Sequence, residues 1–199
     1  MKPVTREEVL GLAEYEQIRD PFRTRVIEDK KRRRIGLGPH ATCIFENHDT
    51  VLLQIQEMLR TERISREAAV LHEIETYNEL VPNDHELSAT IMIEIDDKAE
   101  RERFLVEAKG LERSFSLVVD GHVCRGRHDK ARENPNRTTS VHYVKFELVQ
   151  EAERALGAVL TGQRKASDVV VLLMVEHPRY SAKVDLPPAL VHELAEDLR

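Results

Sequence analysis

Cysteine, tryptophan and long apolar runs are scarce in this 199-residue chain, and each scarcity narrows the class of protein. Two cysteines, Cys43 and Cys124, make no disulfide framework, which favours a reducing compartment. The longest apolar run, Val169 to Val175, is far shorter than the roughly 20 residues needed to cross a bilayer. The first residues carry acids where a secretory signal needs an apolar core. We therefore expect a cytoplasmic protein without a membrane span.

An excess of positive charge is also missing. The chain has 36 acidic residues against 30 lysines and arginines, a net charge of -6. Proteins that bind the phosphate backbone of nucleic acids usually carry a net basic domain, so generic nucleic-acid binding is disfavoured. No phosphate-binding G-x-x-x-x-G-K-[ST] loop, G-x-G-x-x-G fingerprint, H-E-x-x-H or C-x-x-C occurs, which leaves phosphate-loop NTPases, dinucleotide enzymes and the commonest zinc proteases without a motif.

The first half of the chain has mainly helical patterns. Thr5 with Glu8 matches a capping box, which predicts a helix start. We expect that helix to break near Asp20-Pro21, because proline disfavours helical geometry in the residue before it, and to resume into the basic run from Lys30 to Arg34. A strand over residues 41–45, a helix capped by Asp49 or Thr50, and another helix after Ser65 follow.

The second half has mainly strand patterns. Apolar residues alternate with polar ones over residues 87–95, and the segments 115–119 and 142–148 repeat that period of two. Val169 to Val175 is apolar at every position, which predicts a central strand covered on both faces. Helices are expected over 98–108, 151–160 and 189–198. Together these patterns predict a single α+β domain over residues 1–199, with an antiparallel or mixed β-sheet packed against several helices concentrated in the N-terminal half.

The densest polar segment runs from Phe45 to Thr50, at a predicted junction between strand and helix. Carboxylates and imidazoles suit iron or manganese, so a metal site here would use ligands drawn from a small set of residues: Glu46, His48, Asp49, Glu57 and Glu79. The alternative is that Asp49 caps the helix while Glu46 and His48 are solvated.

Two other groups of residues admit both a functional and a structural interpretation. His40 and Cys43 with the His122, Cys124 and His128 group have the chemistry of a zinc or iron site, but their spacing matches no known ligand signature, and ordinary burial of the two cysteines is favoured. The basic run from Lys30 to Arg34 suits an acidic partner, a phosphate-bearing ligand or RNA. Acids interspersed in that run favour a solvated helix face with ion pairs instead.

Several segments together resemble a bacterial family catalogued only as a domain of unknown function. They are Lys31 to Arg34 with Gly38-Pro39, Phe45 to Asn47, Asp49-Thr50, Gln54 to Arg60, Tyr77 to Pro82, Glu86 to Thr90, Val141 to Tyr143, and His177-Pro178 with Tyr180. The resemblance runs nearly from end to end. Genes of this family often stand beside genes for rubrerythrin-like di-iron proteins and iron-sulfur oxidoreductases, so the resemblance implies work in a redox or oxidative-stress system.

The sequence therefore leaves three functions open. The first is an accessory or binding protein that docks onto a rubrerythrin-like or iron-sulfur partner. The second is an iron- or manganese-dependent enzyme or metal carrier, and the third is RNA binding through Lys30 to Arg34. The candidate residues for binding a partner or ligand are Arg32, Arg33, Arg34, Glu46, Asn47, Asp49, Gln56, Glu57, Arg60, Asn78 and Glu79.

Overall fold

The structure is a computed structural model that describes residues 1–130 and 133–199. Its elements follow one another in chain order as η1 (Arg6–Glu8), α1 (Leu12–Arg32), β1 (Arg34–Leu37), β2 (Ala41–Glu46), α2 (His48–Thr61), α3 (Glu67–Asn78), β3 (Glu86–Ile93), α4 (Lys98–Glu107), η2 (Leu111–Arg113), β4 (Phe115–Val119), β5 (His122–Arg127), β6 (Val141–Glu147), α5 (Gln150–Leu160), η4 (Ala166–Asp168), β7 (Val171–His177), β8 (Tyr180–Asp185) and α6 (Pro188–Glu196).

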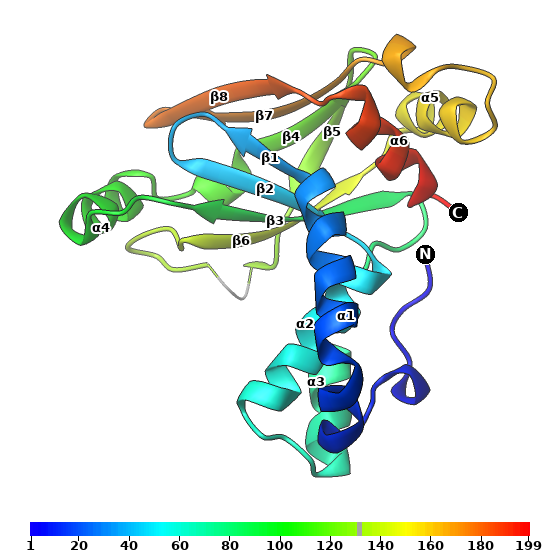
Figure 1. Cartoon of the computed structure of the whole chain (residues 1–199). Helices are drawn as coiled ribbons and strands as arrows, with labels where there is room; N and C mark the ends of the chain where they lie inside the picture. The colour runs from blue at the N-terminus through cyan, green and yellow to red at the C-terminus, as the bar shows by residue number, and fades with distance from the viewer. Residues whose placement is uncertain (131–132) are drawn as a thin grey trace.

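The strands form one sheet in the order β1-β2-β3-β6-β5-β4-β7-β8, and every pair in it is antiparallel. The sheet curves until its edge strands approach each other (Figure 1). Tyr180 on β8 fastens the two edges, because its hydroxyl donates to the Leu37 carbonyl of β1 and accepts from the His40 amide at 3.1 Å. The expected α+β fold with an antiparallel sheet is confirmed.

The inside of the curved sheet is the main hydrophobic core. Period-two alternation points Cys43 and Phe45 of β2, Leu87 and Ile91 of β3 and Phe146 of β6 inward, where all five are buried. Both cysteines are buried and unpaired, which agrees with their structural interpretation. Helices α5 and α6 cover one end of this core and α4 lies at the other (Figure 1).

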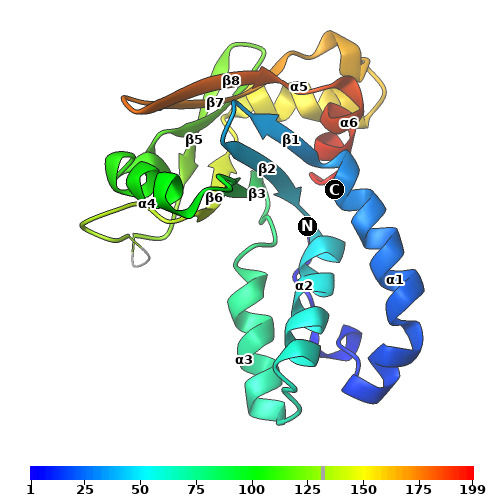
Figure 2. The same ribbon diagram turned by 60° about the vertical axis from the view of Figure 1, so that its left-hand side comes forward.

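Helices α1, α2 and α3 stand side by side away from the sheet, and we call them the helical arm (Figures 1 and 2). A second hydrophobic cluster fills the arm: Val4, Val9, Val51, Ile55, Leu59, Val70, Ile74, Leu80 and Val81. None of the described helices is long and apolar enough to cross a membrane.

The prediction that helices concentrate in the N-terminal half was wrong. Within the described chain three α-helices precede β3 and three follow it. The later three bury apolar residues at the ends of the curved sheet, for example Leu105 of α4, Leu156 of α5 and Leu194 of α6. A curved sheet leaves both ends of its core open, and helices from the second half close them.

Helix α1 does not break at Pro21. It runs unbroken from Leu12 to Arg32 with the proline inside it. A proline within a helix costs about 3 kcal/mol. Contacts on both sides of it hold the helix, because Tyr15 and Val26 are fully buried and Arg25 pairs with Asp49 of α2.

Smaller differences have local causes. Helix α2 begins at His48, and its cap is Asn47, whose side chain accepts from the Thr50 amide while Thr50 bonds back to the Asn47 amide. Strand β7 is buried at Val171, Leu173 and Val175, but Leu172 and Met174 between them are only partly buried, so only one of its faces is fully covered. Sequence patterns missed β1, β5 and β8, whose exposed polar residues hide the alternation.

Candidate functional site

A cleft of about 730 Å³ opens beside β6 and brings together three parts of the chain. One wall comes from the end of α3 and the loop after it, including Asn78, Glu79 and Asn83. The middle comes from Ser88 of β3 and residues 141–145 of β6. The other wall comes from the described residues between 127 and 139, together with Glu112 of η2. The cleft is larger than a second hollow of about 280 Å³ that is lined by Asp120, Arg154 and Arg164.

The pairing of β6 explains why the cleft forms there. Strand β6 pairs with β3 along its whole length, but with β5 only through Phe146 and Lys145. Strand β5 ends at Arg127, and β6 begins at Val141. Residues 141–144 therefore lack a β5 partner in the described structure, and the cleft borders both faces of the strand. Tyr143 and Lys145 point to the helical-arm side, while His142 and Val144 point to the core side.

Two cations, Lys145 and Arg127, line what we call the outer end of the cleft, and both bind the buried carboxylate of Glu86. Lys145 donates to Glu86 Oε1 at 2.6 Å and to the Val81 carbonyl at 3.2 Å, and Arg127 lies 3.2 Å from Glu86 Oε2. Burial by itself would raise the pKa of Glu86. The hydrogen bonds from Lys145 and from Asn83, with the charges of both cations, outweigh burial and hold that pKa below its ordinary value.

The opposite, inner end gathers acids and imidazoles. His128 Nε2 lies 2.6 Å from Glu133 Oε1, and Arg113 binds the other oxygen of Glu133. The Arg113 hydrogen bond, followed by that of His128, lowers the pKa of Glu133 to about 2. Beside them the Thr138 hydroxyl donates to Glu112 Oε2 at 2.7 Å in a buried position. Glu133 is therefore negative at neutral pH.

His142 is the least satisfied group of the inner end. Its side chain is 96% buried, and its Nε2 atom finds no hydrogen-bond partner among the described residues. The ring bonds instead to the backbone of Thr139, which assigns the proton to Nδ1. Burial lowers the pKa of His142 to about 4, although nearby Glu112 opposes that shift. At neutral pH the ring is uncharged and its Nε2 is a pure acceptor.

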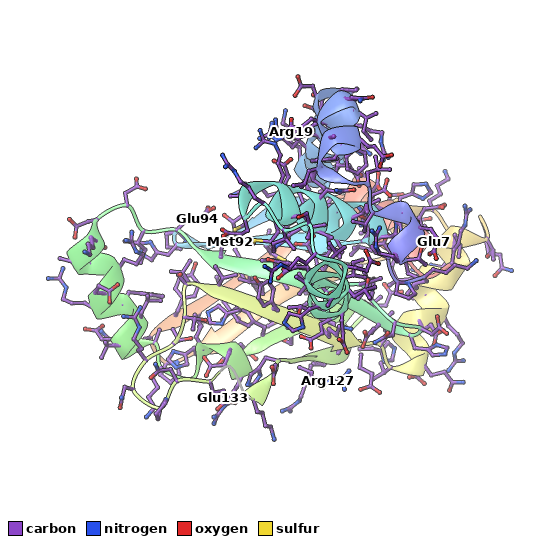
Figure 3. The ribbon with its side chains drawn as sticks, turned by 90° about the horizontal axis from the view of Figure 1, so that it is seen from below. Glu7, Arg19, Met92, Glu94, Arg127 and Glu133 are labelled. Carbon is purple, nitrogen blue, oxygen red and sulfur yellow. The ribbon has the colours of Figure 1, made fainter. Side chains whose placement is uncertain are left out.

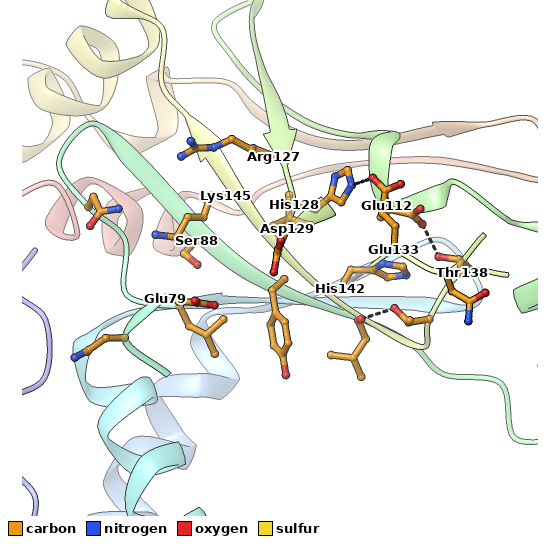
Figure 4. Close-up of a pocket in the computed structure, with 18 of the residues that line it drawn as sticks. Glu79, Ser88, Glu112, Arg127, His128, Asp129, Glu133, Thr138, His142 and Lys145 are labelled. Atoms are coloured by element: carbon orange, nitrogen blue, oxygen red, sulfur yellow. Dashed lines mark hydrogen bonds and ion pairs between the residues drawn. The ribbon is translucent and has the colours of Figure 1, made fainter. Parts of the chain in front are cut away.

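Figure 4 shows the two ends apart, with Lys145, Arg127, Ser88 and Glu79 on one side and His128, Glu133, Glu112, Thr138 and His142 on the other. Figure 3 places Arg127 and Glu133 on the opposite side of the molecule from Arg19 of the helical arm. The cleft and the outer surface of α1 are therefore separate features.

The structure spreads the sequence-predicted candidates over several places. Arg33 is buried in an ion pair with Asp197. Arg32 binds Asp29 and Glu193. Arg34 reaches Glu94 at 2.6 Å. These arginines fasten the junction of α1, β1 and α6. RNA binding through this run stays a prediction, with its side chains engaged in ion pairs.

The polar segment between β2 and α2 is largely used locally. Asn47 caps α2, and Asp49 binds Arg25 at 2.6 Å and lies 3.3 Å from His48 Nδ1. Glu46 is buried and accepts from the Thr90 hydroxyl at 2.6 Å, with Lys30 at 3.8 Å.

The remaining candidates lie in or beside the helical arm. Gln56 binds the Leu10 backbone, and Arg60 binds Glu16. Glu57 accepts hydrogen bonds from Arg19 and Tyr15. Asn78 binds both backbone groups of Val4. Asn78 and Glu79 also line the cleft, as does His128 from the proposed zinc or iron group.

The proposed metal ligands do not meet at one point. His48 and Asp49 touch each other, whereas Glu57 is engaged with Arg19 and Glu46 with Thr90. In the described part of the chain no three His, Cys, Asp or Glu side chains are placed to hold a metal ion. An iron or manganese site thus stays a prediction without a preformed ligand set.

The sequence model of a family described as "Protein of unknown function (DUF3501)" matches residues 3–198. The chain belongs to this family. A solved relative supports the assignment, namely the crystal structure of a novel protein of unknown function from Burkholderia pseudomallei K96243. It is 30% identical, with a TM-score of 0.89, and the match covers all of both chains. No curated protein matches the chain.

The sequence patterns did not predict most of the residues that line the cleft beside β6. They did not single out Glu112, Glu133, His142 or Lys145. One signal was present, because His142 shares a strand face with Val144 and Phe146, so alternation alone places an imidazole on the buried side. Three segments that carry the family resemblance meet at the cleft, at Asn78 to Leu80, at Ser88 and at Val141 to Tyr143.

Proposed function

We propose that the protein is a binding protein that holds a small organic molecule in the cleft beside β6. The observation that carries this proposal is a buried imidazole acceptor, His142 Nε2, left without a partner by the described residues at the wall of a cleft of about 730 Å³. Buried polar atoms are nearly always satisfied, and an exception calls for an explanation. A ligand that donates to Nε2 supplies one.

The size and lining of the cleft agree with a small molecule. Ligand pockets usually measure about 300–1,000 Å³ and combine apolar walls with a few placed polar groups. Leu80, Val141 and Val144 supply apolar surface, and the polar groups stand at the two ends. A macromolecular substrate would need a broader surface than this cleft provides.

A blocking substitution tests the proposal. Val141 lies on β6, lines the cleft and is 41% exposed, so Val141→Trp fills the entrance without disturbing the core. Val123 on β5 is 52% exposed and lies outside the cleft, which makes Val123→Trp the matched control. A collection of small organic fragments is screened by ligand-observed NMR against all three proteins.

We expect fragments that bind the unmodified protein and Val123→Trp but not Val141→Trp. The proposal fails if every fragment that binds the unmodified protein also binds Val141→Trp, or if both tryptophan variants lose the same fragments. Thermal melting of each variant shows whether it is folded, so that a loss of fragment binding is assigned to a blocked cleft and not to an unfolded chain.

This role is compatible with an accessory function in a redox system, which the family resemblance implies. The rubrerythrin-like or iron-sulfur partner itself stays a prediction, as does the cytoplasmic location. Both rest on the resemblance and on composition.

A further inference from the structure

We infer that the inner end of the cleft recognises a cationic group with several N–H donors, an amidinium or a primary ammonium, held between the Glu112 carboxylate and His142 Nε2. This inference rests on the proposed function and specifies the chemistry of its ligand. It is carried by the geometry of these two side chains and by the burial of both.

The first step concerns the acceptors. Glu112 is 9% exposed, and within the described residues its hydrogen bond comes from the Thr138 hydroxyl to Oε2. No described lysine, arginine or histidine lies within ion-pair distance of it, since Arg113 is bound to Glu133 instead. A buried carboxylate with a single neutral donor still has the capacity to accept from a cation.

The second step concerns His142. Its Nδ1 proton is committed to the Thr139 backbone, so Nε2 offers only a lone pair. The Glu112 charge acts on this ring, which places the carboxylate and the imidazole near each other, and Figure 4 shows both at the same end of the cleft. Within the described residues, His142 Nε2 has no donor and Glu112 has only the Thr138 hydroxyl, so the two acceptors match a ligand group that has at least two N–H donors.

The third step concerns the sign of the charge. Glu133 is ionised and holds Arg113 and His128, Glu112 offers carboxylate oxygens, and His142 is neutral. An anion would meet acceptors and negative charge there, whereas a cation gains charge-assisted hydrogen bonds. The chemistry of the inner end therefore selects against carboxylates and phosphates.

Benzamidine and benzamide are suitable probes, because they have nearly the same shape but only benzamidine is a cation with four N–H donors. Binding of each to the full chain is measured by calorimetry at neutral pH. We expect benzamidine to bind at least about tenfold more tightly, the effect of roughly one charge-assisted hydrogen bond. Glu112→Gln should reduce the ratio to below about threefold.

Two further variants control the experiment. Glu176→Gln makes the same charge change at an exposed position of β7 and should keep the full preference. His142→Phe retains a ring of similar size, removes the acceptor and should weaken benzamidine several-fold while leaving benzamide nearly unchanged. If Glu112→Gln fails to fold, His142→Phe still decides the question.

The outcomes separate this inference from the proposed function. If benzamide binds as tightly as benzamidine, or if neither binds while Val141→Trp still blocks other fragments, the cationic subsite is wrong and the binding cleft stands. If Val141→Trp blocks no fragment at all, the cleft itself is wrong. Mn²⁺ or Zn²⁺ that displaces benzamidine and is lost in Glu112→Gln would show a metal subsite and overturn the inference.

Discussion

The guanidinium of Arg33 and the carboxylate of Asp197 form a buried, two-point ion pair that ties the end of α1 to the residues after α6. Arg33 Nη1 lies 2.6 Å from Asp197 Oδ2, and Nη2 lies 2.9 Å from Oδ1. Asp29 and Glu193 flank the same guanidinium at 3.4 Å and 3.2 Å. Residues 164 positions apart thus hold the helical arm against the sheet.

This pair predicts a large difference between two neighbouring arginines. Arg33→Met leaves Asp197 buried and unpaired, so we expect the free energy of unfolding to fall by about 3 kcal/mol or more. Arg32→Met removes an exposed arginine with ion pairs at the surface and should cost less than about 1 kcal/mol. Urea unfolding of the two variants measures the difference. Equal losses of unfolding free energy in the two variants would show that the buried Arg33 pair adds nothing to stability beyond the surface ion pairs of Arg32.

Glu57 is expected to act in the helical arm as a structural acceptor. It accepts from the Tyr15 hydroxyl and, at two points, from Arg19, all at 2.8 Å. Glu57→Ala leaves the hydroxyl of the fully buried Tyr15 without its acceptor, which should lower the free energy of unfolding by about 2 kcal/mol. Glu62→Ala, at an exposed position just after α2, is the control and should be nearly neutral. Elemental analysis of untagged protein adds a second readout, because bound metal lost only in Glu57→Ala would favour the metal site instead.

Two glycines in strands should respond differently to alanine. A Cβ on Gly126 would lie 2.6 Å from Val144 Cγ1 and 2.9 Å from the Phe115 carbonyl oxygen, whereas a Cβ on Gly36 meets nothing within 4 Å. Gly126→Ala should cost about 1–3 kcal/mol and weaken fragment binding, because Val144 lines the cleft. Gly36→Ala should change neither property. Thermal melting with the fragment screen measures both, and similar behaviour of the two variants would contradict the structure.

His142 should make the protein sensitive to mild acid. Its pKa lies near 4 in the folded chain and near 6.5 when unfolded, so the unfolded chain binds more protons between these values. This contribution to stability is complete above about pH 6.5 and declines as the pH falls toward 4. Glu112 favours and His128 opposes protonation of the ring.

The variant His142→Phe isolates this effect. Between pH 7 and pH 4.5 the unmodified protein should lose about 2 to 3 kcal/mol more of its unfolding free energy than His142→Phe loses. At pH 7 the variant should be as stable or more stable by up to about 1 kcal/mol, because it removes a buried acceptor for which the described residues supply no donor. Parallel pH profiles of the two proteins would show that His142 is not the titrating group.

Much of the fold follows from local patterns in the chain. Alternation over residues 87–95, 115–119 and 142–148 predicts β3, β4 and β6, and apolar spacing predicts α4, α5 and α6 to within a few residues. Local patterns failed where distant contacts decide, as in α1, where packing against α2 overrides Pro21. They also failed for β1, β5 and β8, whose partners rather than residue types make them strands.

The candidate site shows the same division more strongly. Glu112, His142 and Asn78 come from separate stretches of chain, and spacing in the sequence carries no information about their distance. The residues singled out beforehand, such as Arg33 and Glu57, proved to be bound to other parts of the protein. Charged side chains next to turns and helix starts attract attention in a sequence, yet many of them serve as caps and ion pairs.

The sequence by itself determined the α+β class and the burial of alternate residues, because these depend on composition and on periods of two and 3.6 residues. Its particular segments also carried the resemblance to the family. Only the tertiary structure decided that β5 leaves β6 after two paired residues and that a cleft opens along the free part of that strand. It also decided that His142 lies buried there with a nitrogen that finds no partner among the described residues. Pairing between strands and the satisfaction of buried polar atoms depend on which distant residues meet, and that is fixed only when the whole chain packs.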